Sequence, residues 1–132
     1  SMNLESRSKI LEFTDLKAWQ ESHRLVLLIY QFTKKFPKEE SYGLVSQMRR
    51  AAVSITSNIA EGFGRQGYKE KIQFYYLAHG SLIELKNQLI VAHDVGYIDE
   101  GVFQSAVQQS SIAHRLLRGL ITKSKSFVIH HS

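Results

Sequence analysis

The sequence contains no cysteine. Disulfides, thiolate metal sites, iron–sulfur clusters and cysteine nucleophiles are therefore all excluded, and a reducing cytoplasm is permitted. Proline is nearly absent, with Pro37 alone, and there are eight glycines. A protein of many short strands needs a turn roughly every 8–12 residues, which these few turn-forming residues do not provide. The absences point away from an all-β fold.

Long hydrophobic runs are missing as well. The longest uninterrupted apolar run covers residues 25–30, whereas a helix needs roughly 20 apolar residues to cross a bilayer. The beginning of the chain lacks the basic and then apolar pattern of a signal peptide. We therefore expect a cytoplasmic protein without membrane contact, and we interpret Ser1 and Met2 as the remnant of a purification tag.

The chain does contain enough apolar material for one folded domain. Its 132 residues are 43% hydrophobic and 22% charged, which are ordinary values for a globular domain. Seventeen Lys and Arg against twelve Asp and Glu give a net charge of +5. A basic surface favours a polyanionic partner such as RNA or DNA. Many small domains are basic without such a partner, so charge alone leaves both interpretations open.

Hydrophobic residues recur at helical spacing along four stretches. The connections between the stretches are short, so neighbouring helices should run antiparallel. The sequence therefore predicts an all-α fold, an up-down-up-down antiparallel four-helix bundle. We expect its helices to begin at a cap near Thr14, at Ser41, near Tyr68 and at Asp99, and to end at about residues 36, 61, 95 and 123. We divide the chain into a flexible N-terminal segment (1–13), the bundle (14–123) and a C-terminal tail (124–132).

The first predicted helix has apolar residues on two faces. One face carries Leu16, Trp19, His23, Val26, Leu27 and Tyr30, and the other carries Leu25, Leu28, Ile29, Phe32 and Phe36. In so small a bundle each helix should expose one face to water, and a second apolar face predicts a subunit interface. A central position for this helix, or a terminal tail that covers it, is the alternative.

A polar row on the second predicted helix is a further candidate for that interface. It includes Arg50, Ser54, Asn58 and Glu61, which are small or hydrogen-bonding residues typical of a helix–helix or subunit contact. Arg50 has three interpretations that stay open: an interface residue, a contact to phosphate, or a buried structural partner of Glu61.

Several catalytic and metal-binding motifs can be tested against the sequence. Residues 62–67 match G-x-G-x-x-G, but a dinucleotide site needs a preceding strand, and here a helix is predicted instead. No Glu is followed by His three residues later, so a di-iron carboxylate bundle is excluded. We nominate no catalytic residue, no metal ligand and no cofactor, and we expect the protein not to be an enzyme.

Basic residues are the remaining candidates for function. The glycine-rich turn exposes amide groups beside basic side chains and is suited to a backbone phosphate, and the outer face of the fourth predicted helix carries two adjacent arginines. Binding of this kind should tolerate any sequence and weaken steeply with salt. The candidate nucleic-acid-binding residues are Arg49, Arg50, Arg65, Lys69, Lys71, Arg115 and Arg118.

Three stretches together carry a family resemblance. They are D-L-K-A-W-Q at residues 15–20, R-R-A-A-V-S-I followed by N-I-A-E-G-F-G-R within residues 49–65, and A-H-G-S-L-I-E-L at residues 78–85. The chain resembles the bacterial four-helix-bundle family encoded in intervening sequences of 23S ribosomal RNA genes, over about residues 13–123. It is also similar to the accessory protein of diversity-generating retroelements, a basic pentameric bundle that works with a reverse transcriptase and nucleic acid.

The resemblance implies a ring-shaped homopentamer and identifies no catalytic residue. With the charge pattern, it leads to the hypothesis of a homopentameric bundle that binds RNA or DNA. The alternative is an interaction scaffold that docks another protein, such as a polymerase.

Overall fold

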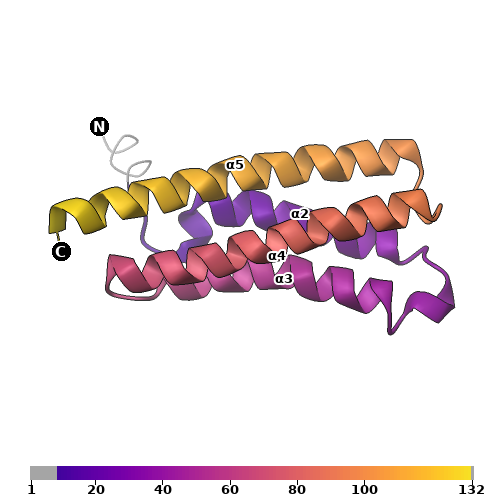
Figure 1. The fold of residues 1–132 in the computed structure, drawn as a ribbon, viewed down its shortest axis with the longest axis horizontal. Helices are drawn as coiled ribbons and strands as arrows, with labels where there is room; N and C mark the ends of the chain where they lie inside the picture. The colour runs from indigo at the N-terminus through magenta and orange to yellow at the C-terminus, as the bar shows by residue number, and fades with distance from the viewer. Residues whose placement is uncertain (1–8, 132) are drawn as a thin grey trace.

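A computed structural model describes residues 9–131, with side chains described to residue 128. Within this part of the chain, four long α-helices follow one another: α2 (Lys17–Thr33), α3 (Leu44–Phe63), α4 (Tyr68–Asp94) and α5 (Glu100–His131). Two short 3-10 helices, η1 (Phe13–Asp15) and η2 (Lys38–Glu40), precede α2 and α3. The helices alternate in direction along one long axis (Figure 1). The predicted all-α four-helix bundle is confirmed.

Each helix packs against two others. Helices α2 and α4 both contact α3 and α5, which places the four helices in cyclic order around one core. Apolar side chains at helical spacing face inward because only that stripe of each helix is shielded from water. The fully buried large side chains include Leu25, Ile29, Met48, Ile55, Ile59, Tyr75, Leu82, Leu85, Leu89 and Leu117.

The turn after α4 shows why the chain reverses there. Gly96 has φ of +89°, a left-handed conformation that glycine adopts without steric cost. The Tyr97 N–H donates to the Ala92 carbonyl at 2.9 Å and the Gly96 N–H donates to the His93 carbonyl at 3.1 Å. This pair of bonds is the Schellman motif, and it confirms the prediction that Gly96 ends the third helix.

The start of α3 is held by a side chain from the preceding segment. Oε1 of Glu40 accepts a hydrogen bond from the Leu44 N–H at 3.1 Å, which satisfies one of the free amide groups of the first turn. Oε2 of the same carboxylate accepts a hydrogen bond from the Tyr97 hydroxyl at 2.8 Å. Glu40 thus ties the α2–α3 connection to the α4–α5 connection at one end of the bundle.

The end of the last helix differs from the prediction, whereas α3 ends at Phe63, close to its predicted end at about residue 61. Helix α5 continues to His131 instead of ending near Lys123, because Ser124 is buried and the Phe127 ring stacks on Tyr68 at 4.8 Å. Gly62 lies inside α3, where a Cβ would meet the Tyr75 ring at 2.7 Å. Glycine is needed there for close packing of α3 on α4, and it does not end the helix. No helix among the described residues is long and apolar enough to cross a membrane.

Candidate nucleic-acid interface

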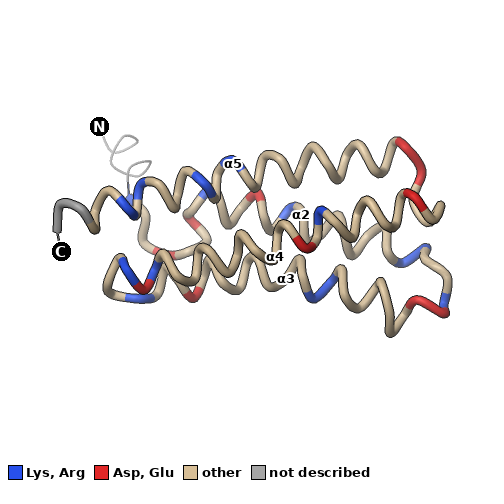
Figure 2. The backbone as a smooth tube through the Cα atoms, in the orientation of Figure 1, with Lys and Arg blue, Asp and Glu red and all other residues tan. Residues whose placement is uncertain are grey.

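Helix α5 carries basic charge without acidic charge along nearly its whole length. After Glu100, the rest of the chain has Arg115, Arg118, Lys123 and Lys125 but no Asp or Glu. The four basic residues lie in the half of α5 near its C-terminus (Figure 2). The α3–α4 turn lies at the same end of the bundle (Figure 2); the turn contains Arg65, and the start of α4 contains Lys69 and Lys71. The two basic segments therefore share one end of the molecule.

A surface pocket of about 360 Å³ lies between α4 and α5 in this region. Its walls carry a lysine, a histidine, two arginines and two hydroxyl residues, and no carboxylate. Such a set of side chains offers hydrogen-bond donors and positive charge, which suits a phosphate or another oxyanion. The lining residues are Lys86, Ser111, His114, Arg115, Arg118, Gly119 and Thr122.

His114 makes two hydrogen bonds at the wall of this pocket. Its Nδ1 lies 2.7 Å from Nζ of Lys86, and its Nε2 lies 3.1 Å from Nε2 of His79. Because an ammonium group has no acceptor, Lys86 donates and Nδ1 of His114 accepts. A neutral His114 then carries its proton on Nε2 and donates it to Nε2 of His79.

The surroundings of His114 favour this neutral form. Burial lowers the pKa of His114, and the positive charge of Lys86 lowers it further, with smaller contributions from His79 and Arg118. Burial also lowers the pKa of Lys86. Sequence reasoning identified Arg115 and Arg118 but missed Lys86, His79 and His114 as their neighbours. The bond from His79 to His114 joins residues 35 positions apart, so no local pattern announces it.

The α3–α4 turn uses part of its basic charge internally. Nζ of Lys71 donates a hydrogen bond to the Phe63 carbonyl at 2.6 Å and lies 5.2 Å from the centre of the Phe63 ring. Lys71 therefore neutralises the C-terminal end of α3, and its role as a phosphate contact stays a prediction. The guanidinium of Arg65 lies 4.5 Å from the centre of the Phe74 ring, and both Arg65 and Lys69 are exposed.

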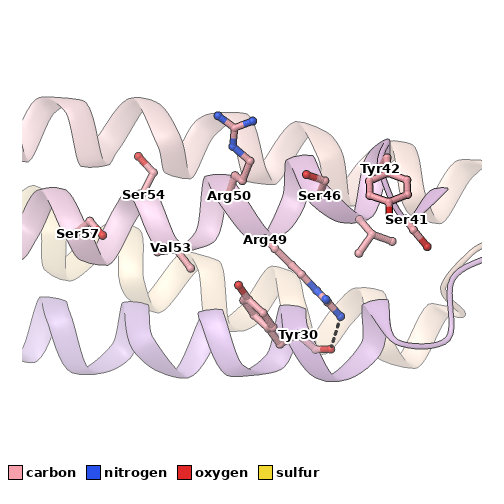
Figure 3. A pocket seen from close by; sticks show the side chains of 10 residues that line it. Tyr30, Ser41, Tyr42, Ser46, Arg49, Arg50, Val53, Ser54 and Ser57 are labelled. Atoms are coloured by element: carbon pink, nitrogen blue, oxygen red, sulfur yellow. Dashed lines mark hydrogen bonds between the residues drawn. The ribbon is translucent and has the colours of Figure 1, made fainter.

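Arg49 and Arg50 point in opposite directions from α3 (Figure 3). The Arg49 guanidinium donates to Oγ1 of Thr33 at 3.0 Å and to the Tyr30 carbonyl at 3.4 Å, and it covers the Tyr30 ring at 4.6 Å. Arg49 thus holds the end of α2 against α3, and its role as a phosphate contact stays a prediction. Arg50 is exposed and points away from α2.

Arg50 and Glu61 do not form the buried pair that the sequence left open. Both side chains are exposed, and 11 residues of helix separate them by about 16 Å. One of the small polar residues between them, Ser54, contacts α4 within the same chain: the Ser81 hydroxyl donates to the Ser54 hydroxyl at 2.8 Å. Nδ2 of Asn58 donates to the Ser54 carbonyl at 2.8 Å within α3 itself. The assignment of this row to a subunit contact stays a prediction.

The predicted interface on the first helix is mostly interior. Leu25 and Ile29 are 0% exposed, Phe32 and Phe36 are also buried, and Leu28 is half-buried. These four buried side chains contact their own bundle and offer no surface to another subunit, which corrects that prediction. The exposed apolar residues of α2 come from the other face, where Leu27 and Tyr30 lie.

Helix α4 carries the second apolar face that was assigned to the first helix. Tyr76, Ile83 and Ile90 recur every seven residues along its outer side, which is the spacing of a helix–helix contact. Their heptad spacing was a signal available in the sequence. The outer side of α4 carries five large apolar side chains that are 41–57% exposed: Tyr76, Leu77, Ile83, Ile90 and Val91.

Metal ligands do not gather in the described part of the chain: no three His, Asp or Glu side chains there are placed to hold one ion. His79 and His93 lie 14 residues apart along α4, and each makes its own contact with α5. His79 contacts His114, and Nε2 of His93 lies 2.8 Å from Oε1 of Glu100.

Comparison with known proteins supports a single family. The family model of 23S rRNA-intervening sequence proteins matches residues 14–119. A solved structure of a protein of unknown function from the S23 ribosomal protein family of Bacteroides thetaiotaomicron is similar in fold, with a TM-score of 0.71. The two chains are 19% identical, and the likeness covers 79% of this chain and 97% of that one. No curated protein matches this chain.

Proposed function

This chain belongs to the 23S rRNA-intervening sequence protein family, and we propose that it is a non-enzymatic, self-assembling cytoplasmic bundle that binds the phosphates of RNA or DNA. One observation carries the proposal. Helix α5 places Arg115 and Arg118 on a pocket that also contains Lys86 and His114 and contains no carboxylate. A pocket of this composition attracts oxyanions and repels cations.

The proposed binding is electrostatic and independent of base sequence. Arg115 and Arg118 are exposed and make no ion pair among the described residues, so their charge is available to a phosphate. Each neutralised phosphate releases condensed counterions, and the binding constant then falls steeply with salt. Arg65 and Lys69 extend the positive surface at the same end of the bundle.

Self-assembly would multiply this charge. The outer side of α4 carries five exposed large apolar side chains, and exposure of this kind is typical of a surface that is buried between subunits. The resemblance to a pentameric family implies a ring of five. Five protomers of 15.1 kDa each would have a mass of about 75 kDa, and five times the net charge of +5 gives +25. A ring would bring several α5 pockets to one nucleic-acid molecule, and affinity would rise with the number of contacts.

The direct test is a fluorescence-anisotropy titration of a short structured RNA with the purified protein at low and high salt. We expect submicromolar binding at low salt that weakens by about a hundredfold or more when salt is raised fourfold. Binding of a duplex DNA and of an unrelated RNA should follow the same salt dependence. Absence of binding at low salt, or equal binding at both salt concentrations, would overturn the phosphate-binding proposal.

A protein-interaction scaffold is the second candidate, and the groove between α2 and α3 favours it. This pocket of about 590 Å³ is bordered by Tyr30, Tyr42 and Val53 (Figure 3), and the Tyr42 side chain is 99% exposed. An exposed aromatic residue beside a groove is typical of protein contact sites. Co-purification of one defined protein that Tyr42→Ser abolishes, with RNA binding absent, would make this the preferred function.

A further inference from the structure

Lys86, His114 and His79 form a continuous hydrogen-bonded array across the α4–α5 interface. The array runs from Nζ of Lys86 to Nδ1 of His114 at 2.7 Å, and from Nε2 of His114 to Nε2 of His79 at 3.1 Å. With Lys86 as donor, both imidazoles are neutral, and His79 carries its proton on Nδ1. Every nitrogen within the array is then matched as donor to acceptor.

This array has no place for an additional proton. A proton on Nδ1 of His114 would face the Lys86 ammonium group, which has no lone pair. A proton on Nε2 of His79 would face the N–H of His114. Protonation of either ring therefore breaks one of the two hydrogen bonds and adds a positive charge beside Lys86 and Arg118.

An anion in the adjoining pocket would remove this conflict. The Lys86 ammonium group could turn from His114 to the anion, and the freed Nδ1 could take up a proton and donate it to a second anion oxygen. Arg118 and Arg115 line the same pocket and supply further donors. The added positive charge on His114 would be offset by the negative charge of the anion.

We propose that the pocket between α4 and α5 binds a tetrahedral, phosphate-type oxyanion together with one proton on His114, so that its affinity for the anion rises as pH falls. The proposal rests on the proposed function for the biological source of that anion, which is a phosphate of RNA or DNA. It specifies the pocket between α4 and α5 as the site of phosphate binding, and it makes the affinity of this site depend on pH. Coupling between the two ligands is reciprocal, so the anion must also raise the pKa of His114.

The groups that face His114 set the direction of this coupling. Lys86 and His79 approach from α4, and Arg118 approaches from α5 itself; all three are basic. No carboxylate lines the pocket. In the free protein these neighbours oppose protonation, and a bound anion screens them. Anion binding therefore favours the protonated form.

Sulfate is the probe that isolates the protein's own titration, because it has the tetrahedral oxyanion shape and does not change protonation between about pH 5 and about pH 8. We would follow sulfate binding and the imidazole signals by NMR on histidine-labelled protein, with His114 assigned from His114→Gln. We expect the apparent Kd for sulfate to increase as pH is raised. The increase should approach tenfold per pH unit between the pKa of His114 in the sulfate-free protein and its pKa in the sulfate-bound protein. Sulfate should also raise the pKa of His114, whereas the ring signals of His93, which lies outside the pocket, should not respond to sulfate.

Two variants test the assignment. His114→Gln should lose the pH dependence of sulfate binding, because glutamine does not titrate. His93→Gln is the matched control, since His93 also bridges α4 and α5 but lies outside the pocket; it should keep the full pH dependence. Circular dichroism checks that both variants are folded. Sulfate binding that is absent, or that does not vary with pH in the folded wild-type protein, overturns the proposal.

Oligonucleotides then separate this proposal from the proposed function. A hydroxyl-ended RNA that binds with the same pH dependence as sulfate identifies a backbone phosphate as the source, and tighter binding of the same RNA with a 5′-phosphate identifies a terminal phosphate. RNA binding without any pH dependence would keep the proposed function and overturn the proton-linked site. Proton-linked sulfate binding without RNA binding would keep the site and overturn the proposed function.

Discussion

His79 and His114 place their Nε2 atoms 3.1 Å apart across the contact between α4 and α5. The contact requires at least one neutral ring, and the Lys86 ammonium group on the far side of His114 makes the neutral form of both rings the matched one. Protonation of either imidazole ring would therefore disturb both the contact between α4 and α5 and the pocket beside it.

This pair predicts how stability depends on pH. The pKa of His114 is lowered by burial and by its basic neighbours, so below about pH 6.5 the unfolded chain takes up a proton that the folded chain resists. The free energy of unfolding should therefore fall as pH is lowered through that range toward the folded pKa. Urea unfolding at several pH values, without added phosphate or sulfate, measures this dependence.

His114→Gln provides the check on that assignment. The variant should show a smaller loss of stability on acidification than the wild-type protein, because glutamine does not titrate. An unchanged pH profile in His114→Gln would contradict the neutral, hydrogen-bonded array.

The hydrogen bond from Tyr97 to Glu40 predicts a second pH effect. Hydrogen bonds from Leu44 and Tyr97 lower the pKa of Glu40, so its contribution to stability is present above its unfolded value and is lost as pH falls through the folded pKa. The bond also raises the pKa of Tyr97, so the tyrosine contribution is lost only in strong alkali. Tyr97→Phe should lower Tm near neutral pH, whereas Tyr42→Phe, at an exposed position, should leave Tm unchanged. Equal Tm values for both variants and the wild type would contradict this role.

Gly62 should tolerate no side chain. A Cβ there would lie 2.7 Å from the Tyr75 ring and 2.9 Å from Cβ of Phe74. Gly62→Ala should lower the free energy of unfolding by about 1–3 kcal/mol through overpacking. Gly119→Ala is the matched control, since nothing lies within 4 Å of a Cβ there, and it should raise stability by about 0.5–1 kcal/mol. Urea unfolding measures the free energy of unfolding of both variants. If Gly62→Ala is as stable as Gly119→Ala, or more stable, α3 and α4 are not packed as described.

The outer face of α4 should carry the assembly. A double variant, Ile83→Lys with Ile90→Lys, places two charges on this exposed apolar surface and should reduce the mass in light scattering from that of the oligomer to the protomer value of 15.1 kDa. Helix content should be unchanged because both side chains lie outside the core. Leu27→Lys on α2 is the matched control and should keep the oligomer. A wild-type protein that is itself monomeric, or a double variant that stays oligomeric, would contradict this interface.

Periodicity predicted the bundle because each core stripe is a local property of its own helix. The same reasoning predicted that the third helix ends just before Gly96, since a glycine directly after an apolar helical stretch is the usual signal for the C-terminal end of a helix. The end of α5 was missed because Ser124 is buried by packing, which a polar residue in the sequence does not reveal.

The candidate site depends on contacts between residues of different helices, and the hydrophobic periodicity of one helix does not predict such contacts. Two apolar faces were visible on the first helix, but nothing local shows that Ile29 faces the core while Leu27 faces solvent. Basic residues were identified by type alone, so Arg49 and Lys71 were grouped with Arg118 although they hold helix ends. The contact of Lys86 with His114 depends on how far α4 is shifted along α5, and only the three-dimensional structure provides that.

Phosphate binding by α5 is tested most directly by comparing the RNA affinity of two double variants of equal charge. Arg115→Gln with Arg118→Gln removes two charges from the α5 pocket, and Lys34→Gln with Lys35→Gln removes two charges from exposed positions just beyond α2. Phosphate binding by α5 predicts that the first pair of substitutions weakens RNA binding at low salt at least about tenfold, since one hydrogen bond to a charged group contributes roughly 1.5–3 kcal/mol. It predicts that the second pair changes affinity by less than about threefold. Equal losses in the two variants, or no loss in the first, would contradict phosphate binding by α5.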